Sequence, residues 1–258
     1  MNIVQLLKSA VVKVLIGGQA RQLYWKTRRR KSDARAWRAK HLRGAFPLPA
    51  SVEKAMVDTL ITIRHHWCPL EKPRVLASLI VRDGIERSVE IGVYTGASFV
   101  AQAVAARYVG GLAIGIDPYS ALEAEQQDNS EILEPTREQR GKRDWEALYS
   151  GLLQMLENHN LSTSARILRM PSADAADLIE PGIGLLHIDG NHDYAKLRSD
   201  IEKYLPKLKP GGYLVVDDIG WPTIQPQYEE LKKRMAVVYE DPGTWGCLVK
   251  GSSFKSAK

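Results

Sequence analysis

Hydrophobic residues along this chain follow two periods, and the alternation between them predicts the fold. Short apolar runs, which are typical of buried strands, alternate with stretches whose apolar residues recur at helical spacing. The predicted strands are residues 88–91, 112–116, 165–170, 184–188, 213–216, 235–239 and 245–249. The clearest helices among them are residues 97–107 and 194–205. Strands that alternate with helices predict a parallel, doubly wound sheet.

The last two apolar runs have no helical pattern between them. They are separated by a stretch that contains Glu240-Asp241-Pro242-Gly243, which is a turn signal. They therefore predict an antiparallel strand pair at the end of the chain. The expected fold class is α/β: a Rossmann-like, seven-stranded, mostly parallel doubly wound sheet with a C-terminal antiparallel pair and an N-terminal helical extension.

The N-terminal extension has its own pattern. Residues 1–16 predict an amphipathic helix, which Gly17-Gly18 ends. Residues 51–66 predict a helix that leads into the main domain. We therefore divide the chain into a basic helical arm, residues 1–50, and a main domain, residues 51–258.

Charge separates these two parts more sharply than the total suggests. The net charge of the 258 residues is +6, but residues 1–44 alone carry +11 and the remainder carries −5. One interpretation of the arm is peripheral contact with an anionic membrane surface at its inner face. The other is a helix packed on its own domain or on a partner in a homo-oligomer, followed by a solvated basic face. The arm lacks the pattern of a signal peptide, and it lacks the serine content of a mitochondrial transit peptide.

The cysteines and the lengths of the apolar runs indicate no disulfide framework, zinc site or membrane span. Cys68 and Cys247 are too few for a disulfide framework and lack zinc-site spacing. No apolar run reaches the roughly 18 residues of a membrane span. We expect a cytoplasmic protein, with the peripheral membrane contact as an addition.

Residues 120–143 form a polar insertion at the carboxyl edge of the sheet, and they predict either a lid over substrate or a surface loop.

A glycine-rich turn follows the first predicted strand. Residues 89–98, VEIGVYTGAS, place Gly92 and Gly96 where the backbone turns sharply and the following helix begins. Asp117 follows the second strand, where an acid in nucleotide-binding α/β folds accepts hydrogen bonds from ribose. The glycine spacing differs from the dinucleotide-binding pattern. Glu90 would repel a pyrophosphate, but it suits a ligand that carries an ammonium and a sulfonium group.

These segments together resemble a class I S-adenosylmethionine-dependent methyltransferase. The resemblance rests on VEIGVYTGASF, GIDPYS, LLHIDGNHDYAKLRSDI and LKPGGYLVVDD, and it covers about residues 86–250. It is strongest to metal-dependent O-methyltransferases of small molecules and sugars. It implies that S-adenosylmethionine is the cofactor, that Asp117 holds its ribose, and that Ser172 lies near its adenine. The residues assigned to the cofactor are Glu90, Gly92, Tyr94, Thr95, Gly96, Ser98, Asp117, Ser172 and Asp189.

A second polar set follows two later strands. Asp189 comes after one buried strand, and Asp217 and Asp218 come after the next. If the strands are neighbours, the three carboxylates converge, and a cation would relieve their repulsion. Oxygen ligands favour Mg²⁺, with Mn²⁺ or Ca²⁺ as alternatives. Such an ion would lower the pKa of a bound acceptor hydroxyl, and His192 would take the proton.

The related family has members with the same arrangement. In some of them Glu stands where this chain has Asp217, so the metal geometry is in question. Other interpretations stay open: Asp189 as a helix cap, His192 as a loop histidine, and the acidic pair as a solvated or cofactor-binding group. His187 is expected to face the core, and Asp193 and Asp200 are assigned no chemistry.

The expected function is O-methylation of a hydroxyl on a sugar, a polysaccharide end or a related natural product. Alternatives are a metal-free small-molecule methyltransferase with His192 as base, including N-methylation, and a nucleic-acid methyltransferase that grips its substrate with the arm. The sequence lacks the motif for amino methylation of bases, which disfavours the last. The glycine spacing disfavours an NAD-dependent oxidoreductase, and the set of Asp189, His192, Asp217 and Asp218 disfavours a non-catalytic binding protein.

Overall fold

The computed structural model describes residues 43–63, 68–69, 71–128 and 142–251. The contacts divide the chain into two units, residues 1–47 and 48–258, and every element below belongs to the second. The predicted helix at residues 1–16, most of the basic arm and residues 129–141 of the polar insertion lie outside the described residues. Within them, no helix is both long enough and apolar enough to cross a membrane.

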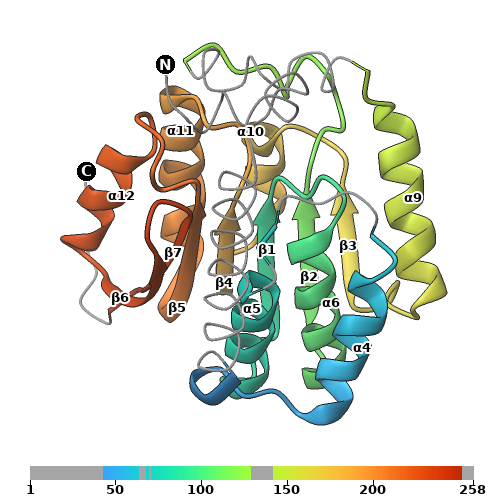
Figure 1. The fold of residues 1–258 in the computed structure, drawn as a ribbon. Coiled ribbons are helices and arrows are strands. Elements are labelled where there is room, and N and C mark those ends of the chain that lie inside the picture. Colours follow the sequence, from blue (N-terminus) through green and yellow to red (C-terminus); the bar gives the residue numbers. More distant parts are fainter. Residues whose placement is uncertain (1–42, 64–67, 70, 129–141, 252–258) are drawn as a thin grey trace, which may run out of the picture. The chain divides into compact units, whose positions relative to one another are not determined.

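A seven-stranded sheet forms the centre of the second unit (Figure 1). Its order is β3-β2-β1-β4-β5-β7-β6, and every pair is parallel except those that include β7. This arrangement confirms the predicted mostly parallel sheet with an antiparallel C-terminal pair. The strands are β1 Arg87–Ile91, β2 Leu112–Ile116, β3 Ala165–Leu168, β4 Ile183–Ile188, β5 Leu208–Asp217, β6 Ala236–Asp241 and β7 Trp245–Val249.

Helices cover both faces of the sheet (Figure 1). On one face α4 (Ala50–Leu60) and α5 (Glu71–Arg82) pack with α6 (Ala97–Val109), while α9 (Trp145–Asn158) lies near β3 at the sheet edge. On the other face α10 (Ser172–Ala175), α11 (Tyr194–Tyr204) and α12 (Gln225–Lys232) enclose an apolar core with the strands. Short 3₁₀ turns, Ala176–Leu178 and Leu205–Lys207, follow α10 and α11.

The main departures from the predicted elements concern helices and the start of β5. Helix α5 was not predicted, although Val75, Leu76, Leu79 and Ile80 are fully buried at helical spacing. Helices α9 and α12 were not predicted either. Strand β5 begins at Leu208, five residues before the predicted start, because its first residues pair across an irregularity in the β4–β5 register. Helix α4 ends at Leu60 rather than at residue 66.

The chain order reverses between β1 and β4, which are neighbours in the sheet. At such a reversal the connections from the two strands leave toward opposite faces, and a crevice opens beyond the carboxyl ends of the strands. The loops after β1, β2, β4 and β5 all lie at this edge. The fold therefore brings the two predicted polar sets to one place.

Candidate functional site

A cavity of about 550 Å³ lies at the carboxyl ends of the strands. Its size falls within the usual range for small-molecule sites. Most of the predicted site residues line it: Gly92, Tyr94, Thr95, Ser98, Asp117, Ser172, Asp189, His192, Asp217 and Asp218. Glu90 and Gly96 were also assigned to the cofactor, and neither lines the cavity. Loops from five strands therefore enclose one space that joins the predicted cofactor turn to the predicted chemical residues.

Gly92 permits the closest approach in this site. Its φ is +85°, and a Cβ there would lie 2.0 Å from the carbonyl oxygen of Asp189. Any side chain would therefore push the β1 loop away from the end of β4. Gly96 has a different task, since it is the N-cap of α6 with φ of +86° and a Cβ there would meet Leu152 of α9 at 2.6 Å. Gly92 shapes the cavity, whereas Gly96 allows helix packing behind it.

Asp117 holds the β1 loop beside the end of β2. Its Oδ2 accepts hydrogen bonds from the backbone N–H groups of Val93 and Tyr94, both at 2.9 Å. Its Oδ1 accepts one from the N–H of Tyr119 at 2.8 Å. Burial raises the pKa of Asp117, and these three hydrogen bonds oppose that rise. A carboxylate has about four acceptor positions, so the predicted contact with ribose hydroxyls remains compatible with this bracing and stays a prediction.

Glu90 is fully buried and faces polar neighbours instead of the cavity. It accepts hydrogen bonds from Ser98 Oγ at 2.7 Å and from Gln102 Nε2. His187 Nδ1 lies 3.0 Å from Glu90 Oε2, because the register of β1 and β4 places these two residues side by side. Glu90 therefore has no direct contact with the cavity, and Ser98, which donates to it, does line the cavity.

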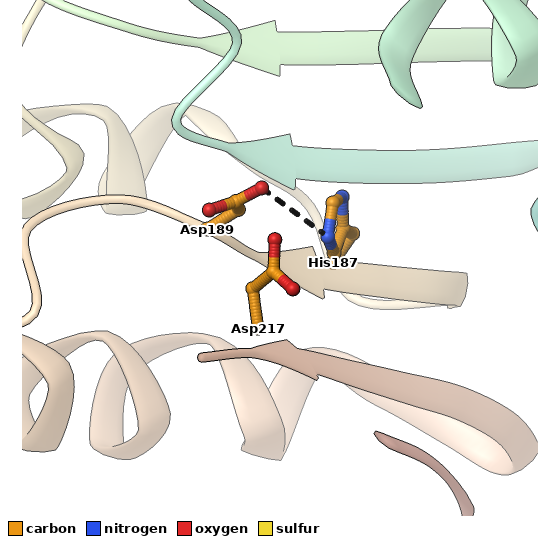
Figure 2. Close-up of side chains that lie close together, drawn as sticks. All are labelled: His187, Asp189 and Asp217. Carbon is orange, nitrogen blue, oxygen red and sulfur yellow. Dashed lines mark ion pairs between the residues drawn. The ribbon is translucent and has the colours of Figure 1, made fainter. Parts of the chain in front are cut away.

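The carboxylates of Asp189 and Asp217 converge at the ends of β4 and β5 (Figure 2). A lysine that the sequence did not single out lies between them. Lys72, in the first turn of α5, is fully buried and donates a hydrogen bond to Asp189 Oδ2 at 3.0 Å and another to Asp217 Oδ2. The two carboxylates line the cavity, and Lys72 lies behind them.

The electrostatics of this group follow from burial and close contact. Burial acts to lower the pKa of Lys72, but Asp189 and Asp217 outweigh it and hold that pKa above its usual value. Burial acts to raise the pKa of Asp217, but Lys72, Asp189 and His187 together outweigh it and lower that pKa, so Asp217 is a carboxylate. Burial and repulsion from Asp217 raise the pKa of Asp189. The site therefore holds an ammonium, the carboxylate of Asp217 and a second carboxyl group, that of Asp189, which is protonated more readily than usual.

His187 belongs to the same group and is buried, as the sequence predicts. It is fully buried, and its Nε2 lies 4.0 Å from Asp189 Oδ2 (Figure 2). Together with Asp217 the two residues offer ligand atoms that all lie within 4.8 Å of one another. Among the described residues this is the group of histidine and acidic side chains with the spacing of a metal site.

A divalent ion fits this group poorly while Lys72 keeps its position. The ion would share Asp189 and Asp217 with an ammonium that already contacts both. At a separation of about 4 Å, a dication and an ammonium would repel each other by about 8 kcal/mol at an effective dielectric constant of 20. The predicted magnesium site at Asp189, Asp217 and Asp218 thus requires Lys72 to withdraw, and it stays a prediction.

His192 faces the cavity on the other side of Asp189. Its Nε2 lies 3.7 Å from Asp189 Oδ1 and 3.4 Å from Asp218 Oδ2, and its ring lies 4.9 Å from that of Trp221. Burial lowers the pKa of His192 to about 4, so the imidazole is neutral near pH 7. A neutral imidazole beside carboxylates is suited to accept a proton.

Asp218 completes this side of the cavity. Its φ of +50° is rare for residues other than glycine, although aspartate tolerates it better than most. Burial, with repulsion from Asp217, raises its pKa to about 7. The Asp218 carboxyl group is thus partly protonated near neutral pH. A ligand group held between Asp218 and His192 could form a hydrogen bond with it.

The loop after β4 also holds the described part of the polar insertion. Asp193 is the N-cap residue of α11, so Asp189 is not the helix cap that one interpretation proposed. The Asp193 carboxylate accepts hydrogen bonds from the N–H groups of Gln127 and Asp128 at 2.8 and 2.9 Å. Gln126 Nε2 lies 3.2 Å from His192 Nδ1. Residues 120–128 therefore border the cavity next to His192, as a lid or a binding loop would.

Asp200 is a site residue that the sequence analysis missed. It lies on α11 and is 4% exposed, and it lines the cavity beside Ser172, whose Oγ donates a hydrogen bond to Asp200 Oδ1 at 2.6 Å. Burial raises the pKa of Asp200 to about 6. The sequence feature that could have identified Asp200 is its position one helical turn after the buried Leu197, on the inner face of α11.

A family model described as a methyltransferase domain matches residues 89–219, half of the chain. The chain belongs to this methyltransferase family. The match runs from β1 to just beyond β5, and thus includes both the glycine turn and the acidic pair. It confirms the resemblance predicted from the sequence.

Solved structures with the same fold agree with this assignment. The SAH-bound methyltransferase PaMTH1 of Podospora anserina is 10% identical with a TM-score of 0.56, over 85% of this chain and 96% of that one. The O-methyltransferase NovP is 17% identical with a TM-score of 0.55, over 70% and 79%. A putative caffeoyl-CoA O-methyltransferase from Staphylococcus aureus is 14% identical with a TM-score of 0.53, over 79% and 93%. At these identities the likeness concerns the fold, which is that of the methyltransferase family.

One sequence relative is more similar over a short stretch. The protein named "Uncharacterized protein y4gI", from Sinorhizobium fredii, is 35% identical over 65 residues. The match spans 25% of this methyltransferase-family chain and 7% of the relative.

Proposed function

We propose that this protein is an S-adenosylmethionine-dependent O-methyltransferase that acts on a hydroxyl group of a sugar or a related natural product. One observation carries the proposal: a single cavity joins Gly92 and Asp117 to His192 and Asp189. A methyl donor seated on the first pair would present its methyl group to the second. Family membership and the SAH-bound state of PaMTH1 support S-adenosylmethionine as that donor.

The charge of the cavity suits this cofactor. A sulfonium is a permanent cation, and Lys72 balances part of the charge of Asp189 and Asp217 from behind. Asp218 adds a further acidic group at the cavity wall. The cavity therefore retains an acidic side that attracts a cationic donor.

His192 provides the base that the reaction needs. The acceptor oxygen attacks the methyl carbon, the carbon–sulfur bond breaks, and the hydroxyl proton passes to His192. The products are a methyl ether and S-adenosylhomocysteine. Because the imidazole is neutral near pH 7, it is ready for this step, and Asp189 and Asp218 stabilise the imidazolium that forms.

The acceptor pocket has features that favour a sugar or another ring. Tyr94, Trp145 and Trp221 line the same cavity, and flat aromatic surfaces stack well against sugar rings and natural-product rings. The names of NovP and of the caffeoyl-CoA enzyme support transfer to oxygen over transfer to nitrogen.

Divalent-metal assistance, which the sequence predicts, is the alternative to this mechanism. The carboxylates of Asp189, Asp217 and Asp218 would hold Mg²⁺, which would lower the pKa of a bound acceptor hydroxyl. The convergence of His187, Asp189 and Asp217 supports it, whereas the position of Lys72 opposes it. The version without a metal keeps His192 as the base.

The test is His192→Ala against His159→Ala. His159 is the C-cap residue of α9 and does not line the cavity, so it controls for loss of a histidine. We expect His192→Ala to lower kcat by about 10²–10⁴-fold, the usual contribution of a general base. S-adenosylmethionine affinity, measured by calorimetry, should change little in either variant. If His192→Ala methylated an acceptor as fast as the wild type does, His192 would not be the base.

A further inference from the structure

The site has a cation of its own, and it comes from outside the matched family segment. Lys72 precedes the family match, which begins at residue 89. It reaches Asp189 and Asp217 across 117 and 145 residues of sequence. Helix α5 fixes this position, because four apolar residues, Val75, Leu76, Leu79 and Ile80, anchor it in the core.

The partners of Lys72 are two of the three residues in the group with metal-site spacing. Its ammonium contacts one oxygen of each carboxylate in the group with metal-site spacing. The third member of that group, His187, is engaged on its Nδ1 side with Glu90, 3.0 Å away. The ammonium thus occupies the shared ligand positions of both acids.

We propose that Lys72 is the built-in cation of this site: it takes the place of a divalent ion between Asp189 and Asp217, so that the protein holds these acids in position without a metal. The consequence of this inference is metal-independent methyl transfer, and that consequence rests on the proposed function. Lys72 does not line the cavity, so it acts as a positioning residue through Asp189, which neighbours His192.

A metal-binding measurement tests this without any acceptor substrate. Mn²⁺ is titrated into wild type, Lys72→Ala and Lys250→Ala, and free Mn²⁺ is followed by electron paramagnetic resonance. Lys250 is the matched control because it is also a buried lysine, but its ammonium donates to the carbonyl oxygens of Leu205 and Leu208. Circular dichroism shows whether each variant is folded, and Lys72→Ser is the second variant if Lys72→Ala is not.

We expect wild type and Lys250→Ala to bind no Mn²⁺ at this site, and Lys72→Ala to gain one bound ion. The gain in affinity should be at least about tenfold, because removal of the ammonium relieves its repulsion of the ion. Asp217→Asn added to Lys72→Ala should abolish this gain. Tight Mn²⁺ binding by wild type would overturn the proposal. So would a folded Lys72→Ala that binds no Mn²⁺, since removal of the ammonium would then open no cation site.

A second readout separates positioning from general stability. If Lys72 replaces an ion, Mg²⁺ or Mn²⁺ should restore part of the methyl transfer lost in Lys72→Ala, through kcat more than through KM. Wild-type turnover should be the same with chelator as with Mg²⁺, and dependence on Mg²⁺ would overturn the inference. If wild type failed to bind S-adenosylmethionine, the proposed function would fall, while the Mn²⁺ titration would still decide the role of Lys72.

Discussion

Two buried lysines lie at opposite ends of β5 and differ in what they contact. Lys72 meets Asp217, the last residue of the strand, and Lys250 meets the carbonyl oxygen of Leu208, the first. Burial lowers the pKa of Lys250. Burial also acts to lower the pKa of Lys72, but the two carboxylates outweigh it, so the net direction is upward.

The difference shows how the fold treats its two sheet edges. At the amino edge a lysine satisfies backbone carbonyls, which is a structural task. At the carboxyl edge a lysine balances acids that line a cavity, so the charge is held where ligands bind. A buried charge is tolerated only when it is paired and hydrogen-bonded, and at this edge the pairing is part of the site.

The largest expected effect is that of Lys72→Met. The change removes the ammonium and keeps most of the side-chain volume, so Asp189 and Asp217 are left close together without their cation. We expect a loss of about 3–5 kcal/mol in the free energy of unfolding, the usual cost of breaking a buried pair. Urea denaturation at pH 7 measures this loss. A loss smaller than that of Lys250→Met would contradict the claim that Lys72 balances two buried acids.

A double variant sharpens the same contrast. Asp217→Asn removes one of the two facing charges, so in the Lys72→Met background it should recover stability instead of costing more. The expected recovery is about 1–3 kcal/mol, as for coupled neighbours. Additive losses in the double-mutant cycle would show that the two side chains do not act as a pair.

Lys250→Met should cost less than Lys72→Met. It leaves the carbonyl oxygens of Leu205 and Leu208 without this donor, which corresponds to about 1–2 kcal/mol. S-adenosylmethionine affinity and turnover should match wild type, because Lys250 is absent from the cavity wall. A loss of cofactor affinity in this variant, with the fold intact, would contradict the separation of the two edges.

The smallest expected effect concerns Asp200 and depends on pH. Its pKa is raised to about 6 in the folded protein, above the ordinary value of 3.8, mainly by burial. The folded state therefore binds more protons than the unfolded state between these values, and stability falls as pH rises from about 4 to about 6. Asp200→Asn should remove this fall, which amounts to about 1 kcal/mol between pH 5 and pH 8.

Denaturation at pH 5 and pH 8 measures the difference, with Asp174→Asn on the exposed side of α10 as control. If Asp200→Asn changed the free energy of unfolding by the same amount at both pH values, the Asp200 carboxyl group would have the same pKa in the folded and unfolded states.

Sequence reasoning located the strands and most of the cavity. Buried parallel strands are nearly continuous apolar runs, as in β4, where all six residues are buried. The acids and His192 could be found because each lies within four residues of the end of such a run. The glycine turn was found for the same reason, although Gly96 and Glu90 serve the structure behind the cavity.

The residues that were missed depend on contacts between distant segments. The apolar spacing of residues 75–80 could have predicted α5, but no periodicity states which carboxylates its first turn meets. His187 was expected to be buried, and it is, but its place beside Glu90 follows from the pairing of β1 with β4. Asp200 likewise became a cavity residue only through the packing of α11 against the loop after β3.

The most direct test of the account is a crystal structure with sinefungin, an S-adenosylmethionine analogue that carries an amine-bearing carbon in place of the methyl sulfonium. We predict that the analogue fills the cavity over Gly92, with its amine directed at Asp189, Asp218 and His192, and with Lys72 still between Asp189 and Asp217. An amine directed away from these side chains, or a metal ion in the position of the Lys72 ammonium, would contradict it.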